Sequence, residues 1–244
     1  TTNGGENWSN YNSGLMPEEN IYTLCLVKNI LFAGTDRGIY KSSDEGKKWL
    51  KVNDEIFKTN DIIFDEVNNE VLAATSKGIY RSKDFGVNWN WINNGLDGEM
   101  NVNSITKKGD TIFIGTNDKG ILATQYDKIL WTRLPEEQET EYVQVLKSLG
   151  DDLYIGSSRA FFNLSDGVLS RDVEGIYIYN INAFIENKNI LYTATDNGIF
   201  QSTNFGFTWS ALNKGLQLGV KVTSIIANKQ NDLFAGTDKG IFQF

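Results

Sequence analysis

A short phrase that occurs six times constrains the fold of this chain more than any other feature. Each copy runs from an aliphatic residue through apolar or small residues to a Thr or Ser: Leu31–Thr35, Val71–Thr75, Ile112–Thr116, Leu153–Ser157, Leu191–Thr195 and Leu233–Thr237. The fourth residues of the copies (34, 74, 115, 156, 194 and 236) are spaced by 40, 41, 41, 38 and 42 residues. A period of this length is typical of a four-stranded propeller blade.

Each repeat reads as four short strands separated by turn residues. In the second repeat the expected strands are residues 62–65, 70–75, 79–82 and 89–93, with Asn, Asp or Gly between or after them. No segment has a helical hydrophobic period, so the sequence predicts an all-β chain. We expect one β-propeller domain over residues 1–244, with blades at about 20–60, 61–100, 101–140, 141–178, 179–219, and 220–244 together with 1–15.

The two ends of the chain complement each other in this pattern. The last repeat stops after an expected third strand, Gly240–Phe244, and residues 1–8 align with residues 202–209 of the fifth repeat. The sequence therefore predicts that the N-terminal strand completes the last blade and closes the propeller.

A second motif, Ser/Thr-x-Asp/Asn-x-Gly-x-x-Trp, lies between the expected third and fourth strands. Its Asp or Asn, Gly and Trp positions are Asp44, Gly46 and Trp49; Asp84, Gly86 and Trp89; Asn204, Gly206 and Trp209; and Asn3, Gly5 and Trp8. This motif resembles the Asp-box, or BNR repeat, of sortilin-type receptors, photosystem assembly factors, sialidases and xyloglucan-degrading glycosidases. The chemistry is structural: Asp or Asn accepts backbone hydrogen bonds in a turn, and Gly permits a positive φ.

The third and fourth repeats depart from the Asp-box. Residues 124–131 keep Trp131 but lose the Asp and Gly positions, and residues 161–171 contain no Trp. Two interpretations stay open: simple sequence drift, or an altered surface that contacts a partner.

The resemblance implies that ligands bind on an axial face, formed by the loops between second and third strands and between blades. The candidate binding residues there are Asp36, Arg37, Asp118, Arg159, Tyr177, Tyr179, Asp196 and Asp238. The acidic members could form a broken ring that holds Ca²⁺, but Asp before Gly is also an ordinary turn signal, so we expect no metal or cofactor. Tyr177 and Tyr179 fit either a binding surface or one face of a packed strand.

Composition excludes several functions. The chain has 31 acidic and 23 basic residues, a net charge of −8, which disfavours nucleic-acid binding. It has no His and one Cys, Cys25, which removes His-dependent catalysis, His-ligated metals and an internal disulfide. No apolar run is long enough to predict membrane insertion.

The expected function is a monomeric, non-catalytic binding or scaffold propeller for a protein or a glycan. The alternative is a glycoside hydrolase of the Asp-box type, which needs two facing carboxylates. No motif singles out such a pair, and of five arginines too few are placed for a sialidase triad. The resemblance implies an extracellular or periplasmic location.

Overall fold

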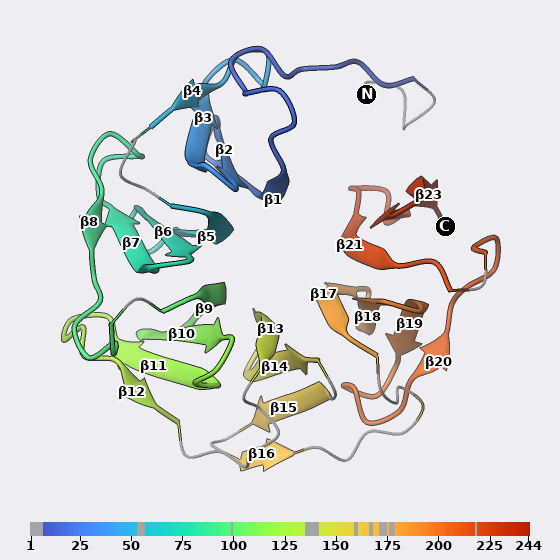
Figure 1. Ribbon diagram of the computed structural model, residues 1–244. Helices are drawn as coiled ribbons and strands as arrows, with labels where there is room; N and C mark the ends of the chain where they lie inside the picture. The colour runs from blue at the N-terminus through green and yellow to red at the C-terminus, as the bar shows by residue number, and fades with distance from the viewer. Residues whose placement is uncertain are drawn as a thin grey trace. The chain divides into compact units, whose positions relative to one another are not determined.

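The structure, a computed structural model, describes residues 7–52, 57–98, 100–134, 142–158, 161–165, 168–170, 175, 179–217 and 219–244. These residues form six antiparallel sheets, five of four strands and one of three, and contain no helix. The prediction of an all-β, six-bladed propeller is confirmed, because each of the six repeats forms one sheet. Each sheet is a meander in which consecutive strands pair (Figure 1).

The chain divides into two compact units, Thr1–Val102 and Asn103–Phe244. The first unit holds blade 1, with β1 (Ile21–Val27), β2 (Ile30–Thr35), β3 (Gly38–Ser42) and β4 (Leu50–Lys51). It also holds blade 2, with β5 (Thr59–Asp65), β6 (Glu70–Thr75), β7 (Gly78–Ser82) and β8 (Asn90–Trp91).

The second unit holds four blades. Blade 3 consists of β9 (Val102–Lys108), β10 (Thr111–Thr116), β11 (Ile121–Gln125) and β12 (Thr132–Arg133), and blade 4 of β13 (Val143–Leu149), β14 (Asp152–Ser157), β15 (Phe161–Ser165) and β16 (Val168–Ser170). Blade 5 consists of β17 (Ile181–Asn187), β18 (Ile190–Thr195), β19 (Gly198–Ser202) and β20 (Ser210–Ala211). Blade 6 consists of β21 (Val222–Ala227), β22 (Leu233–Thr237) and β23 (Gly240–Gln243). The repeated phrase is thus the second strand of every blade.

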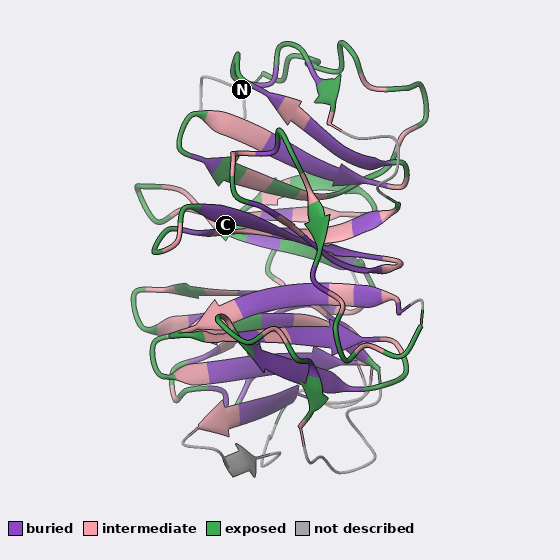
Figure 2. Cartoon of the chain, turned by 90° about the vertical axis from the view of Figure 1, so that its left-hand side faces the viewer, coloured by how far each residue is buried: buried purple, intermediate pink, exposed green. Residues whose placement is uncertain are grey.

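Blades pack face to face through apolar clusters. In the first unit Phe32 and Val27 of blade 1 pack with Ile62 and Val71 of blade 2. In the second unit equivalent clusters join blades 3 and 4, 4 and 5, and 5 and 6. Buried positions concentrate in the first three strands of blades 2 to 5, in β2 and β3 of blade 1, and in β21 and β22 of blade 6 (Figure 2). The short outer strands β4, β8, β12 and β20 are exposed. Burial of apolar area between sheets is the main force that holds neighbouring blades together.

The Asp-box builds the turn before the outer strand in blades 1, 2 and 5. In blade 1 the Ser42 hydroxyl accepts a hydrogen bond from Gly46 N (2.9 Å), and Asp44 Oδ1 accepts one from Lys48 N (2.9 Å). The same pair of bonds recurs in the other two turns, with Ser82 and Asp84 and with Ser202 and Asn204. Their glycines all have a positive φ: Gly46, Gly86 and Gly206.

These bonds occupy the side chains that the motif contributes. The hydroxyl of Ser42 and the amide of Lys48 stabilise the ionised carboxylate and so lower the pKa of Asp44. Hydrogen bonds from Asn88 lower the pKa of Asp84 in the same way. Trp49 and Trp209 are buried and Trp89 is half-buried. The described boxes therefore stabilise their own turns.

The predicted N-terminal closure falls largely outside the described residues. Asn3 and Gly5 are not described, whereas Trp8 is described and 59% exposed. The last blade has three strands among the described residues, β21 to β23. A fourth strand from the N-terminus stays a prediction.

Candidate functional site

A hydroxyl shapes the turn between the second and third strands. In blade 1 the Thr35 hydroxyl donates to Gly38 O (3.0 Å) and accepts from Arg37 N (3.1 Å). Thr75, Thr116, Thr195 and Thr237 make the same donor contact to the glycine at the start of the third strand or, in blade 3, just before it. The Thr at the end of the repeated phrase therefore fixes a tight turn, and the residue after Thr is placed at its tip.

The residue before each first strand lies beside this turn tip. Backbone hydrogen bonds join Asp36 N to Asn20 O (3.3 Å) and Ser76 N to Lys58 O (2.8 Å). In the second unit they join Asp196 N to Asn180 O (3.2 Å) and Asp238 N to Lys221 O (3.1 Å). We call this end of each blade its turn edge, formed by the turn tip and by the residues that enter the first strand.

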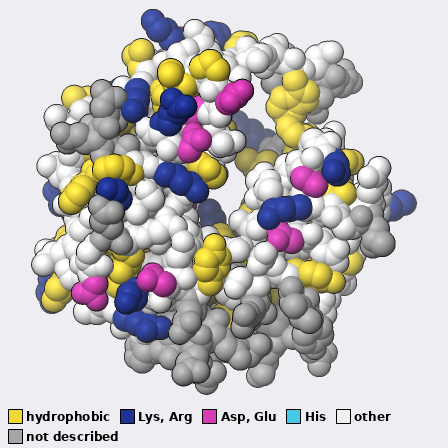
Figure 3. All heavy atoms as spheres, in the orientation of Figure 1, with side chains coloured by type: hydrophobic (Ala, Val, Ile, Leu, Met, Phe, Trp, Pro, Cys, Tyr) yellow, Lys and Arg dark blue, Asp and Glu magenta, His cyan; other side chains and the backbone are white. Residues whose placement is uncertain are grey.

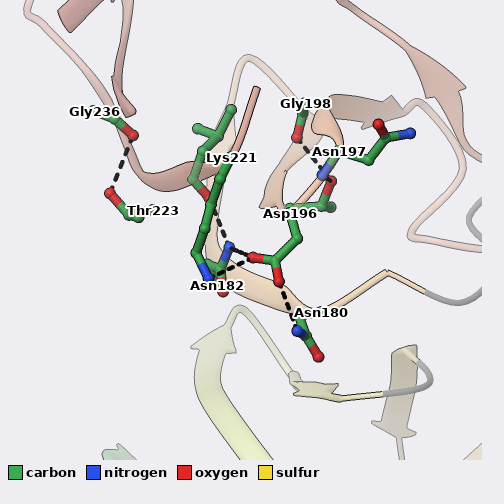
Figure 4. Close-up of polar contacts among 10 residues, drawn as sticks. Asn180, Asn182, Asp196, Asn197, Gly198, Lys221, Thr223 and Gly236 are labelled. Carbon is green, nitrogen blue, oxygen red and sulfur yellow. Dashed lines mark hydrogen bonds and ion pairs between the residues drawn. The ribbon is translucent and has the colours of Figure 1, made fainter. Parts of the chain in front are cut away.

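The most developed turn edge is centred on Asp196 in blade 5 (Figure 4). The Asp196 carboxylate accepts hydrogen bonds from Asn180 Nδ2 (2.6 Å) and Asn182 Nδ2 (3.0 Å). It also forms an ion pair with Lys221 Nζ of blade 6 (2.9 Å). Asn182 donates in addition to Val222 O (2.7 Å) at the start of β21. One carboxylate thus links the edges of two neighbouring blades.

The charge of Asp196 is well compensated. Partial burial on its own raises the pKa of Asp196, but the hydrogen bonds from Asn182, Lys221 and Asn180 and the charge of Lys221 outweigh it. The net effect holds the pKa of Asp196 below its ordinary value of 3.8. Asp196 is therefore ionised at neutral pH, and its oxygens are engaged by donors.

Asparagine links between blades recur along the turn edge and were missed by sequence reasoning. Asn60 Nδ2 donates to Val102 O (2.8 Å), and Asn103 Nδ2 donates to Val143 O (2.8 Å), as Asn182 does to Val222 O. Each is the second residue of its first strand, and at Asn60 and Asn182 the register shifts, as in a β-bulge. An Asn at this position in three of the six repeats is the sequence signal from which these links could have been predicted.

In blade 1 an aromatic residue, Tyr22, takes the place of this asparagine. Lys58 Nζ lies 4.2 Å from the centre of the Tyr22 ring, and Lys77 Nζ lies 4.0 Å from the Phe57 ring. Tyr22 is 47% exposed, so this turn edge combines cations with accessible aromatic rings. Such a surface suits protein or sugar contacts.

The other predicted site residues are placed differently. Asp36 accepts bonds from Asn20 N and Asn20 Nδ2, both at 3.2 Å, and Asp238 lies 3.6 Å from Lys239 Nζ. Arg37 and Asp118 are exposed at turn tips. Arg159 and Tyr177 lie outside the described residues.

Tyr179 lies just before the first strand of blade 5. Its ring stacks on Phe200 with centroids 5.8 Å apart, against the cluster shared by blades 4 and 5. This placement fits the packed-strand interpretation of Tyr179 better than the binding one.

The turn edges carry charges of both signs. Acidic side chains lie beside Lys and Arg on the face drawn in Figure 3. No group of three or more acidic, Cys or His side chains able to hold a metal occurs among the residues described. Asp196 and Asp238 each lie beside a lysine, whereas Asp36 accepts hydrogen bonds from Asn20 alone among the described contacts.

Six antiparallel blades, three of which carry the Ser-x-Asp/Asn-x-Gly turn, define the class as a six-bladed β-propeller, and comparisons with solved structures agree on the fold. The extracellular domain of the putative one-component system BT4673 from B. thetaiotaomicron has a TM-score of 0.80 at 14% identity, over 96% of this chain and 34% of that one. YCF48 from Cyanidioschyzon merolae gives 0.72 at 13%, over 98% and 85%. An ancestral GH74 enzyme gives 0.75 at 13%, over 96% and 37%.

These similarities concern the fold. The chain spans about a third of the length of the two BT4673 structures it matches. No protein-family model matches the sequence, and no curated protein matches it. In the described part of the chain, no helix is long and apolar enough to cross a membrane.

Proposed function

We propose that the chain is a non-catalytic binding module that recognises a protein or a glycan through the turn edges of its blades. The observation that carries the proposal is the state of Asp196, whose carboxylate is held by two amides and an ammonium group. A glycosidase needs an acid and a base or nucleophile that face each other across the sugar. A carboxylate already neutralised by Lys221 suits neither role and instead organises a recognition surface.

The similar structures support this class of function without identifying a ligand. They include extracellular domains of a putative one-component system and a putative hybrid two-component system, and a YCF48 structure bound to a D1 peptide. By this likeness we propose an extracellular or periplasmic binding module that works as a monomer with no bound cofactor. The GH74 similarity keeps carbohydrate cleavage as the alternative that the experiment must address.

The test is a thermal-shift screen against plant, bacterial and host oligosaccharides, with Ca²⁺ and EDTA arms and an assay for new reducing ends. A ligand that binds the native state raises the unfolding midpoint by mass action. We expect a rise with at least one saccharide, or with a protein captured in a parallel affinity experiment, and no new reducing ends. Cleavage of any saccharide would contradict the proposal.

Variants locate the binding surface. Lys221→Ala removes the cation that joins two turn edges, and we expect it to reduce the shift caused by the ligand. The matched control is Lys229→Ala, an exposed lysine in the turn at the other end of β21. An equal loss in both variants, or in neither, would place the site away from the turn edge.

A further inference from the structure

The Asp-box turn of one blade covers an aromatic residue of the blade before it. Gly86 of blade 2 lies so close to Phe32 of blade 1 that a Cβ on Gly86 would stand 2.5 Å from Phe32 Cε1. Trp89 meets the Phe32 ring edge-on with centroids 6.3 Å apart, and Lys41 Nζ donates to Gly86 O (3.4 Å). Phe32 is fully buried as a result.

Blades 4 and 5 repeat this contact with a different aromatic residue. A Cβ on Gly206 would lie 2.6 Å from Phe161 Cζ, and Trp209 meets the Phe161 ring edge-on at 5.2 Å. In both interfaces a tryptophan-bearing turn therefore seals the outer part of the preceding blade.

Blades 3 and 4 lack the parts for this seal. Leu164 pairs with Leu153 as Ser42 pairs with Leu31, so Leu164 stands where the box serine stands in blade 1. A leucine side chain has no oxygen to accept the glycine N–H, and no Trp follows in the fourth repeat. On the facing blade, Ala123 pairs with Phe113 as Lys41 pairs with Phe32, so a methyl group replaces a long side chain.

The result is a cavity of about 870 Å³ lined from both blades, including Phe113, Ala123, Leu153 and Leu164. Phe113 occupies the repeat position of Phe32 but is only partly buried. Two lysines also line the cavity: Lys108 donates to Asp151 O, and Lys128 is exposed and makes no ion pair with the described residues. The volume is within the range of ligand-binding pockets.

We infer that this cavity is a docking site for a protein partner that inserts an aromatic side chain carried on a turn, next to a carboxylate. The aromatic group would take the place that Trp89 occupies against Phe32 at the first interface. The carboxylate would pair with Lys128 at the rim. This site is separate from the turn edges and does not depend on the function proposed for them.

The probe is a fluorescein-labelled peptide with the sequence of residues 82–89, which carries the chain's own aromatic turn, and binding to the full chain is read by fluorescence anisotropy. We expect saturable binding, and at least a tenfold loss when the peptide's Trp is replaced by Ala. The absence of binding at millimolar protein would overturn the inference. A cavity that another part of the chain already fills would give the same negative result and would overturn the inference equally.

Variants show where the peptide binds. Ala123→Leu fills the cavity without adding a charge, and we expect at least a tenfold loss of affinity. Ala211→Leu is the matched control, because Ala211 is exposed on the outer strand of blade 5. Circular dichroism confirms that each variant is folded. Equal affinity in all three proteins would overturn the inference.

Discussion

At the residue scale, Asp196 illustrates how a turn residue becomes a link between blades. The Asn182 amide reaches it from the first strand of blade 5, and the Lys221 ammonium group reaches it from the residue before the first strand of blade 6. We expect Asp196→Asn to lower the free energy of unfolding at pH 7 by about 1 kcal/mol, the usual size for loss of a partly exposed charged hydrogen bond. Urea denaturation of both proteins measures the difference.

The pH dependence of this effect has a definite sign. The folded-state pKa of Asp196 lies below its ordinary value of 3.8, so its contribution is complete above that value and is lost as the pH falls through the folded pKa. The gap between wild type and Asp196→Asn should therefore narrow as the pH falls below about 4. Asp238→Asn is the control, since Asp238 contacts the adjacent Lys239; a gap that keeps its neutral-pH size throughout the acid titration would contradict the expectation.

Sequence reasoning selected Asp36 and Asp196 correctly as turn-tip residues, because Asp before Gly in a repeated turn is a local signal. It did not select Asn182 or Lys221. Their contacts join residues 14 and 25 positions away from Asp196, across a strand pair and a blade boundary. Such contacts depend on the stagger between blades, which the local pattern does not contain.

At the element scale, the sequence predicted the second strands well. The phrase 70–75 is strand β6 and its expected neighbour 79–82 lies within β7, because apolar alternation and turn residues both act locally. The outer strand was predicted at 89–93 but is only Asn90–Trp91. Pairing there is set by the Asp-box turn rather than by strand propensity.

The element-scale prediction concerns the hydroxyl in the tight turn. Thr75 is fully buried, donates to Gly78 O (2.8 Å) and accepts from Lys77 N (3.1 Å). Thr75→Val keeps the shape but leaves both backbone groups without this partner, so we expect a loss of about 1–3 kcal/mol in unfolding free energy. Thr75→Ser keeps the hydroxyl, and Ser157 stands at this position in blade 4, so it should lose less.

Chemical denaturation of the two variants checks this prediction. Equal losses in Thr75→Val and Thr75→Ser would show that the methyl group, and not the hydroxyl, stabilises the turn.

The cavity between blades 3 and 4 was foreseen only in part. The sequence showed that both repeats depart from the Asp-box, and drift or a partner contact were open. The local pattern does not show which residues face the missing turn. Ala123 stands where other blades carry long polar side chains, Lys41, Arg81, Asn163, Gln201 and Gln243, and that comparison required the strand register.

At the scale of the whole molecule, six repeats of one meander build two compact units of two and four blades. Within each unit, apolar clusters join neighbouring blades. Large apolar side chains are exposed on the first and last blades, such as Leu24 and Leu26 on β1 and Ile241 on β23.

The closure prediction can be tested on strand β23. Residues 1–10 align with residues 202–211, which hold the turn and the outer strand of blade 5. If they supply the fourth strand of the last blade, the outer backbone groups of Gly240–Gln243 are hydrogen-bonded in the full chain. Deletion of residues 1–10 should then raise amide exchange in β23 by about tenfold or more, since unpaired edge amides exchange through low-energy local openings. Strand β19 of blade 5, which is paired on both sides, is the internal control. Unchanged exchange in β23 after the deletion would show that the N-terminus does not pair there, and the exposed edge of β23 would then be open to a strand from another chain.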